Sequence, residues 1–88
     1  MDTAVEVFES PERVVVAPSA GRIALPAGDA RAAEGEFILL GESVAAVKLG
    51  DGKEVPVCSA FRGWVMGFLV LDGQPIRSGD PIAWMRNA

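Results

Sequence analysis

Short apolar runs alternate with turn-forming residues along most of the chain. Runs rich in Val, Ile, Leu and Phe are separated at close intervals by Gly, Pro and Asp. This pattern is typical of many short strands rather than of helices. Only residues 29–36 have helical character, and that stretch is too short to form a stable helix by itself. The sequence therefore predicts an all-β protein, with strands at residues 13–16, 23–25, 37–40, 44–49, 54–58, 64–71 and 82–85.

The chain also contains an internal repeat. Residues 35–47 share their pattern of glycines, an acid and aliphatic residues with residues 73–85, and residues 17–23 resemble residues 59–65. Two copies of about 40 residues are too few for a solenoid, so we predict two interlocked halves related by a quasi-twofold axis.

Equivalent positions of the two halves should then have the same local structure. We predict equivalent strand-to-strand bends at Gly21 and Gly63, and equivalent turns at Gly41 and Gly79. The residues predicted to form the core are Val16, Ile23, Ile38, Val44, Val47, Val57, Val65, Leu69, Ile76 and Ile82.

A hairpin is predicted where Gly50-Asp51-Gly52 separates two strands. A three-residue loop with a left-handed glycine in its last position pairs Val47 with Val55 and Lys48 with Glu54. A two-residue loop would shift the register by one residue and mix the two faces. We therefore expect the three-residue loop. The proline in the second strand cannot donate a ladder hydrogen bond, which predicts an edge strand.

The composition excludes several functions. The 88 residues form one domain, and half of them are apolar, so a core needs neither disulfides nor metal. Histidine is absent and Cys58 is the single cysteine, so we find no catalytic constellation and no metal set, and expect the protein not to be an enzyme. A net charge of −4 with scattered basic residues argues against nucleic acid.

The N-terminal residues contain no signal-peptide pattern, and no apolar run approaches the roughly 20 residues that span a bilayer. We therefore expect a cytoplasmic protein without a membrane partner. Residues 1–12 carry four acids and a proline and are interpreted as a loosely held lead-in, which leaves residues 13–88 as the domain.

The duplicated pattern resembles the biotinyl/lipoyl carrier domain family. Ala17-Pro18-Ser19-Ala20-Gly21 is similar to the family's opening Ala-Pro-Met-x-Gly, and residues 63–65, 71–76 and 79–82 are similar to its closing half. The resemblance extends from about residue 15 to residue 86 and implies a barrel-sandwich hybrid, which is a flattened barrel of two quasi-twofold halves. Residues 25–34 occupy the position of the "thumb" of the bacterial biotin carboxyl carrier.

The hairpin departs from that family. Its members carry biotin or lipoate on a lysine at the hairpin tip, within Glu-Ala-Met-Lys-Met or Asp-Lys-Ala. Counted from Gly41, that position falls on Asp51, and counted back from Gly63 it falls on Gly52. Neither is a lysine. The resemblance therefore implies a carrier-like domain without a prosthetic group, acting as an accessory or scaffolding module that binds subunits of a larger enzyme.

The alternative is a covalent swinging-arm carrier, modified at Lys53 with biotin or, less in keeping with the motif, lipoate. A lysine beside the tip offers a mobile amine, and a flexible arm raises the effective concentration of its cargo at two active sites. Against this, Lys53 lies on the strand side of the loop, where it also serves as a solvated charge at a strand edge.

A partner-binding surface is predicted near residues 64–71. Positions that are commonly polar in the family hold Trp64, Met66 and Leu71, with Phe61 just upstream. If these side chains are exposed, they form an apolar patch of the kind that marks a protein interface. The other possibility, equally open, is that the N-terminal dozen residues, or Trp84 and Met85, cover them.

Overall fold

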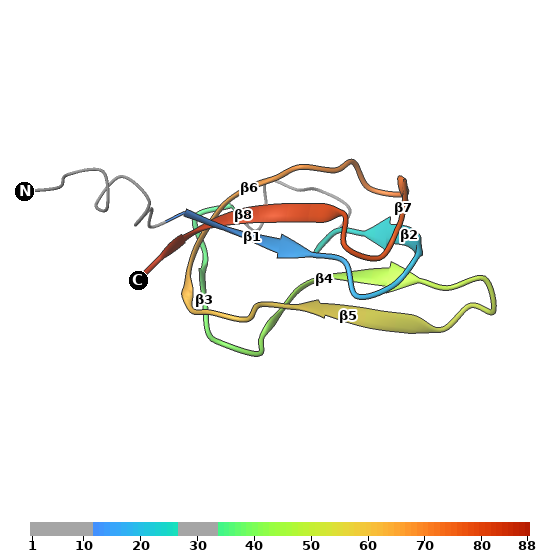
Figure 1. Cartoon of the computed structure of the whole chain (residues 1–88), viewed down its shortest axis with the longest axis horizontal. Coiled ribbons are helices and arrows are strands. Elements are labelled where there is room, and N and C mark those ends of the chain that lie inside the picture. The colour runs from blue at the N-terminus through green and yellow to red at the C-terminus, as the bar shows by residue number, and fades with distance from the viewer. Residues whose placement is uncertain (1–11, 27–33) are drawn as a thin grey trace, which may run out of the picture.

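The computed structural model describes residues 12–26 and 34–88, and these residues form two four-stranded antiparallel sheets (Figure 1). One sheet has the strand order β1-β8-β6-β3, and we call it sheet A. The other has the order β5-β4-β2-β7, and we call it sheet B. The strands are β1 (Glu12–Val16), β2 (Gly21–Ala24), β3 (Phe37–Ile38), β4 (Ser43–Lys48), β5 (Glu54–Cys58), β6 (Gly63–Phe68), β7 (Pro75–Ile76) and β8 (Pro81–Asn87). The predicted all-β fold, a barrel-sandwich hybrid, is confirmed.

The strand boundaries agree with the sequence except at a few places. The strand predicted at residues 37–40 is only two residues long, as β3, and the two-residue β7 was not predicted. The helical character assigned to residues 29–36 falls largely on residues 27–33, which lie outside the described residues. The predicted lead-in likewise lies outside them, except for Glu12, which begins β1.

The turns at Gly41 and Gly79 have matching structures. Each glycine has a positive φ, of 88° and 89°. At the first turn, the N–H of Glu42 donates to the carbonyl of Leu39, and at the second, the N–H of Asp80 donates to the carbonyl of Arg77, both at 3.0 Å. The carboxylates of the same two acids accept the N–H groups of Leu39 and Arg77, at 2.6 and 2.7 Å. Each turn is therefore closed by the same pair of hydrogen bonds.

Gly21 and Gly63 also occupy matching positions, because each begins a strand that runs close to a neighbouring backbone. A Cβ on Gly21 would overlap the carbonyl oxygen of Lys48 on β4, and a Cβ on Gly63 would overlap that of Arg86 on β8. No other residue type fits at either position unless the paired strands separate.

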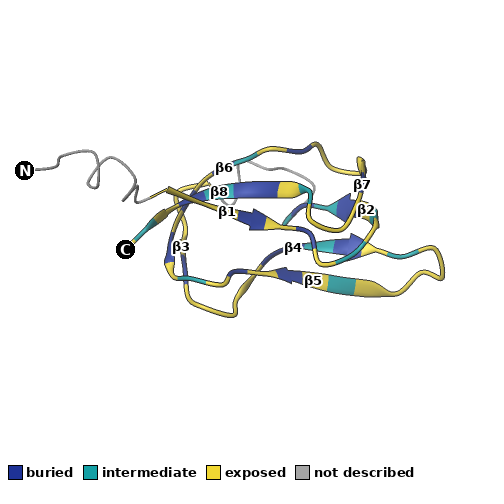
Figure 2. Cartoon of the chain, viewed as in Figure 1, coloured by how far each residue is buried: buried dark blue, intermediate teal, exposed yellow. Residues whose placement is uncertain are grey.

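Eight of the ten predicted core residues are buried between the sheets, and two predictions are wrong (Figure 2). Val16 is 50% exposed, because Val15 is the residue of β1 that points inward and the neighbouring Val14 and Val16 alternate to the outer side. Leu69 is 49% exposed, because β6 ends at Phe68 and alternation no longer holds beyond it. Val70 is buried instead.

Candidate functional site

The hairpin between β4 and β5 has the predicted register. Val47 pairs with Val55 and Lys48 with Glu54, and β5 is an edge strand of sheet B. The three-residue loop is closed by two backbone hydrogen bonds, from the N–H of Leu49 to the carbonyl of Lys53 at 2.8 Å and from the N–H of Gly52 to the carbonyl of Leu49 at 3.0 Å.

The loop residues are those expected from the sequence. Gly52 has a φ of 88°, a left-handed conformation that glycine adopts at little cost. The side chain of Asp51 accepts the N–H of Lys53 at 3.0 Å, which fixes the carboxylate within the turn. Gly50, Asp51 and Gly52 are all exposed. The loop is therefore ordered by its own hydrogen bonds and presents a carboxylate rather than an amine.

Both lysines of the hairpin lie beside the loop and not within it. Lys53 is exposed and follows the turn, with its backbone in the ladder opposite Leu49. Lys48 is exposed on β4 and lies across from Glu54. Modification of Lys53 stays a prediction, for a residue that lies between the last loop residue, Gly52, and the first residue of β5, Glu54.

A row of four residues crosses the outer face of sheet A. Phe37 pairs with Trp64, Trp64 with Arg86, and Arg86 with Glu12. The rings of Phe37 and Trp64 meet edge to face, with their centroids 5.1 Å apart. An ion pair of 3.8 Å joins Arg86 to Glu12 at the other end of the row.

A second apolar row lies beside the first. Val14 pairs with Trp84, which lies opposite Gly67 across a bulge in β6. A Cβ on Gly67 would lie 3.0 Å from Nε1 of Trp84, so the indole ring covers this glycine. Met66, the bulged residue, remains exposed. We call the exposed side of these two rows the aromatic face; its residues are Glu12, Val14, Phe37, Trp64, Met66, Trp84 and Arg86.

The predicted partner-binding residues are only partly brought together. Trp64 and Met66 are exposed on the aromatic face, at 43% and 36%. Phe61 is half-buried against the core. Leu71 is 76% exposed, but it lies beyond the far end of β6, where its N–H donates to the side chain of Gln74. Whether any of the four binds a partner stays a prediction.

The sequence did not indicate Val14, Phe37 and Trp84 as members of the same surface. Of the two residues suggested as a cover, Met85 is fully buried in the core, whereas Trp84 is half-buried within the face itself. The N-terminal residues lie outside the described part of the chain, except for Glu12. The internal repeat could have indicated where Trp84 lies. Its shift of 38 residues matches Trp84 with Ala46 on the opposite sheet.

Sheet B has a different outer face at the matching positions. Arg22 pairs with Lys48, and Lys48 pairs with Glu54. By the shifts of the internal repeat, these three residues match Trp64, Arg86 and Glu12 of sheet A. In the next row, Ala24 pairs with Ala46, and Ala46 with Pro56. Small and charged residues therefore occupy the positions that hold Trp64, Met66, Trp84 and Val14 on sheet A.

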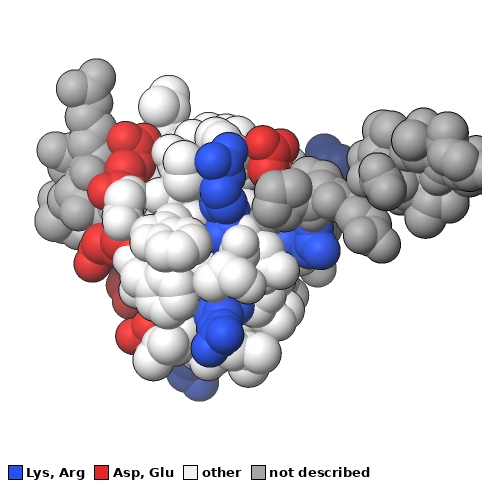
Figure 3. Space-filling view, turned by 90° about the vertical axis from the view of Figure 1, so that its left-hand side faces the viewer, with Lys and Arg blue, Asp and Glu red and all other residues white. Residues whose placement is uncertain are grey.

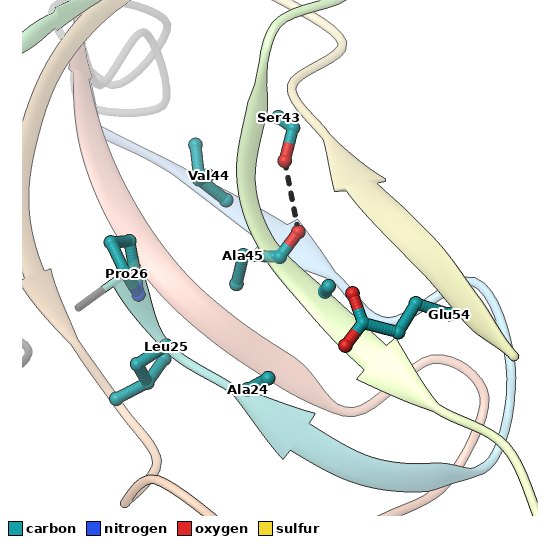
Figure 4. A pocket seen from close by; sticks show the side chains of 8 residues that line it. Ala24, Leu25, Pro26, Ser43, Val44, Ala45 and Glu54 are labelled. Carbon is teal, nitrogen blue, oxygen red and sulfur yellow. Dashed lines mark hydrogen bonds between the residues drawn. The ribbon is translucent and has the colours of Figure 1, made fainter. Parts of the chain in front are cut away.

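The small side chains of sheet B leave an open hollow of about 360 Å³ (Figure 4). Glu54 is the one charged residue among the eight that line it, and its carboxylate extends across β4. The hydroxyl of Ser43 already donates to the carbonyl of Ala45 at 3.0 Å. The hollow therefore does not offer the several convergent polar groups that fix a small ligand.

At the end of the molecule near the termini, basic side chains lie among uncharged ones, and acidic side chains gather along one side (Figure 3). Within residues 12–26 and 34–88, no three side chains of His, Cys, Asp or Glu are grouped so as to hold a metal ion. The same described ranges contain no helix with the length and apolarity needed to cross a membrane.

Neither a protein-family model nor the sequence of a curated protein matches this chain. Among solved structures, the chain is similar to a single-chain, multi-domain long-chain acyl-CoA carboxylase, with a TM-score of 0.70 and 19% sequence identity. The match covers 89% of this chain and 7% of that carboxylase. At this identity, the likeness shows that the fold occurs as a small part of a large enzyme.

Proposed function

We propose that this chain is a non-catalytic, biotinyl/lipoyl-like domain that carries no prosthetic group. In this proposal it acts as an accessory or scaffolding module, which binds protein within a multi-subunit enzyme. The fold supports the proposal in its coarse form, because the same fold forms part of an acyl-CoA carboxylase.

One observation carries the finer form of the proposal, namely the structure of the hairpin loop. Its three residues are Gly50, Asp51 and Gly52, closed by the hydrogen bonds around Leu49 and Lys53. A ligase that modifies a lysine at the apex of such a hairpin meets a carboxylate here. The exposed Trp64 and Met66 provide a surface for protein binding instead.

Intact mass spectrometry of the chain purified from its native host tests the absence of a prosthetic group. We expect the mass of the unmodified chain. An adduct of biotin or lipoyl mass that disappears in Lys53→Arg would overturn the proposal and would establish the covalent carrier.

A biotin ligase assay sharpens this test. We expect no biotin transfer to the wild-type chain, and transfer to a variant in which residues 49–53 are replaced by Glu-Ala-Met-Lys-Met, which moves a lysine to the loop. The variant is the positive control, because it keeps both strands of the hairpin. Biotin transfer to the wild-type chain would contradict the proposal.

Protein binding is tested separately by affinity capture from the native lysate. We expect enzyme subunits to be captured with the wild-type chain and to be lost with Trp64→Glu. Arg22→Glu is the matched control, because Arg22 holds the position equivalent to Trp64 on sheet B. Equal capture by the two variants would show that the aromatic face is not the binding surface.

A further inference from the structure

We draw no further inference here: the strongest candidate, the hollow beside the hairpin that is lined by the cross-strand pair Arg22 and Lys48, carries no proposal, because Glu54 lies across from Lys48 and Arg22 already donates to the carbonyl of Gly73, so that nothing in the structure shows what would cover it.

Discussion

The inner and outer faces of the two sheets differ in how closely they match. On the inner faces, matching positions hold similar residues: Val65 pairs with Met85 in sheet A where Ile23 pairs with Val47 in sheet B, and all four are buried. On the outer faces, matching positions hold a tryptophan and an arginine, or a tryptophan and an alanine. The shared interior therefore constrains the residue type, and the solvent side leaves it free.

This comparison separates residues that maintain the fold from residues that are available for function. The buried positions and the closely approached glycines agree between the halves because both sheets face one core. The aromatic face is present on one sheet only, so the features that the two sheets share do not explain it; a bulge at Met66 in β6, which β2 lacks, is one difference between them. Four sets of substitutions test how strictly this division holds.

The largest difference in stability is expected between Val65→Asp and Trp64→Asp, which place the same carboxylate at two neighbouring positions. Val65 is fully buried, and an unpaired carboxylate there costs more than most domains of this size can tolerate. We expect Val65→Asp to be unfolded at 25 °C. Trp64→Asp should remain folded, with a loss of about 0.5–1.5 kcal/mol from the contact with Phe37. Circular dichroism and urea denaturation measure both, and a cooperatively folded Val65→Asp would show that the inner face tolerates a charge.

The second effect concerns the glycines at which strands approach most closely. A Cβ on Gly63 would overlap the carbonyl oxygen of Arg86, and the paired strands must separate to admit it. We expect Gly63→Ala to lower the free energy of unfolding by about 3 kcal/mol or more, and Gly21→Ala to have a similar effect. Gly50→Ala is the control, because nothing lies within 4 Å of its added Cβ, and it should change stability by less than about 0.5 kcal/mol. An equal loss in all three variants would rule out the proposed backbone contact as the cause.

The sequence predicts those parts of the fold in which local chemistry fixes the register. Opposite charges at Lys48 and Glu54, with valines next to them, define the hairpin, and the structure confirms its pairing. The run Val14-Val15-Val16 contains no polar residue to distinguish the two faces, so the inward residue was assigned one position too late. Alternation along one strand cannot reveal a bulge or the end of pairing.

The candidate site was predicted less completely than the fold. The composition of the loop can be read from the sequence, but the exposure of Trp64 and Met66 was left open, because residues 1–12, Trp84 or Met85 could have covered them. The aromatic face requires the order of β1, β8, β6 and β3, which brings together Val14, Phe37 and Trp84 from distant segments. From the sequence alone, these residues could have been matched with their counterparts on the other sheet only by aligning the two copies of the repeat residue by residue.

A third prediction concerns a graft variant that gives sheet B an aromatic face. Arg22→Trp and Ala46→Trp together should give a folded protein whose stability changes by less than about 1 kcal/mol, because both positions lie on the solvent side. Circular dichroism and urea denaturation measure the fold and the stability of this variant. A graft variant that unfolds would show that the two outer faces are not interchangeable.

The smallest effect is expected in the hairpin loop, which belongs to neither outer face. The carboxylate of Asp51 accepts the N–H of Lys53 at 3.0 Å, in an exposed turn. Asp51→Ala removes this hydrogen bond but lets water replace it, so the free energy of unfolding should fall by only about 0.5–1 kcal/mol. Asp51→Asn keeps an acceptor oxygen and should lose less, which urea denaturation of the two variants can resolve. If Asp51→Ala were as damaging as Gly63→Ala, the loop would be part of the framework, and its lack of a lysine would reflect folding rather than function.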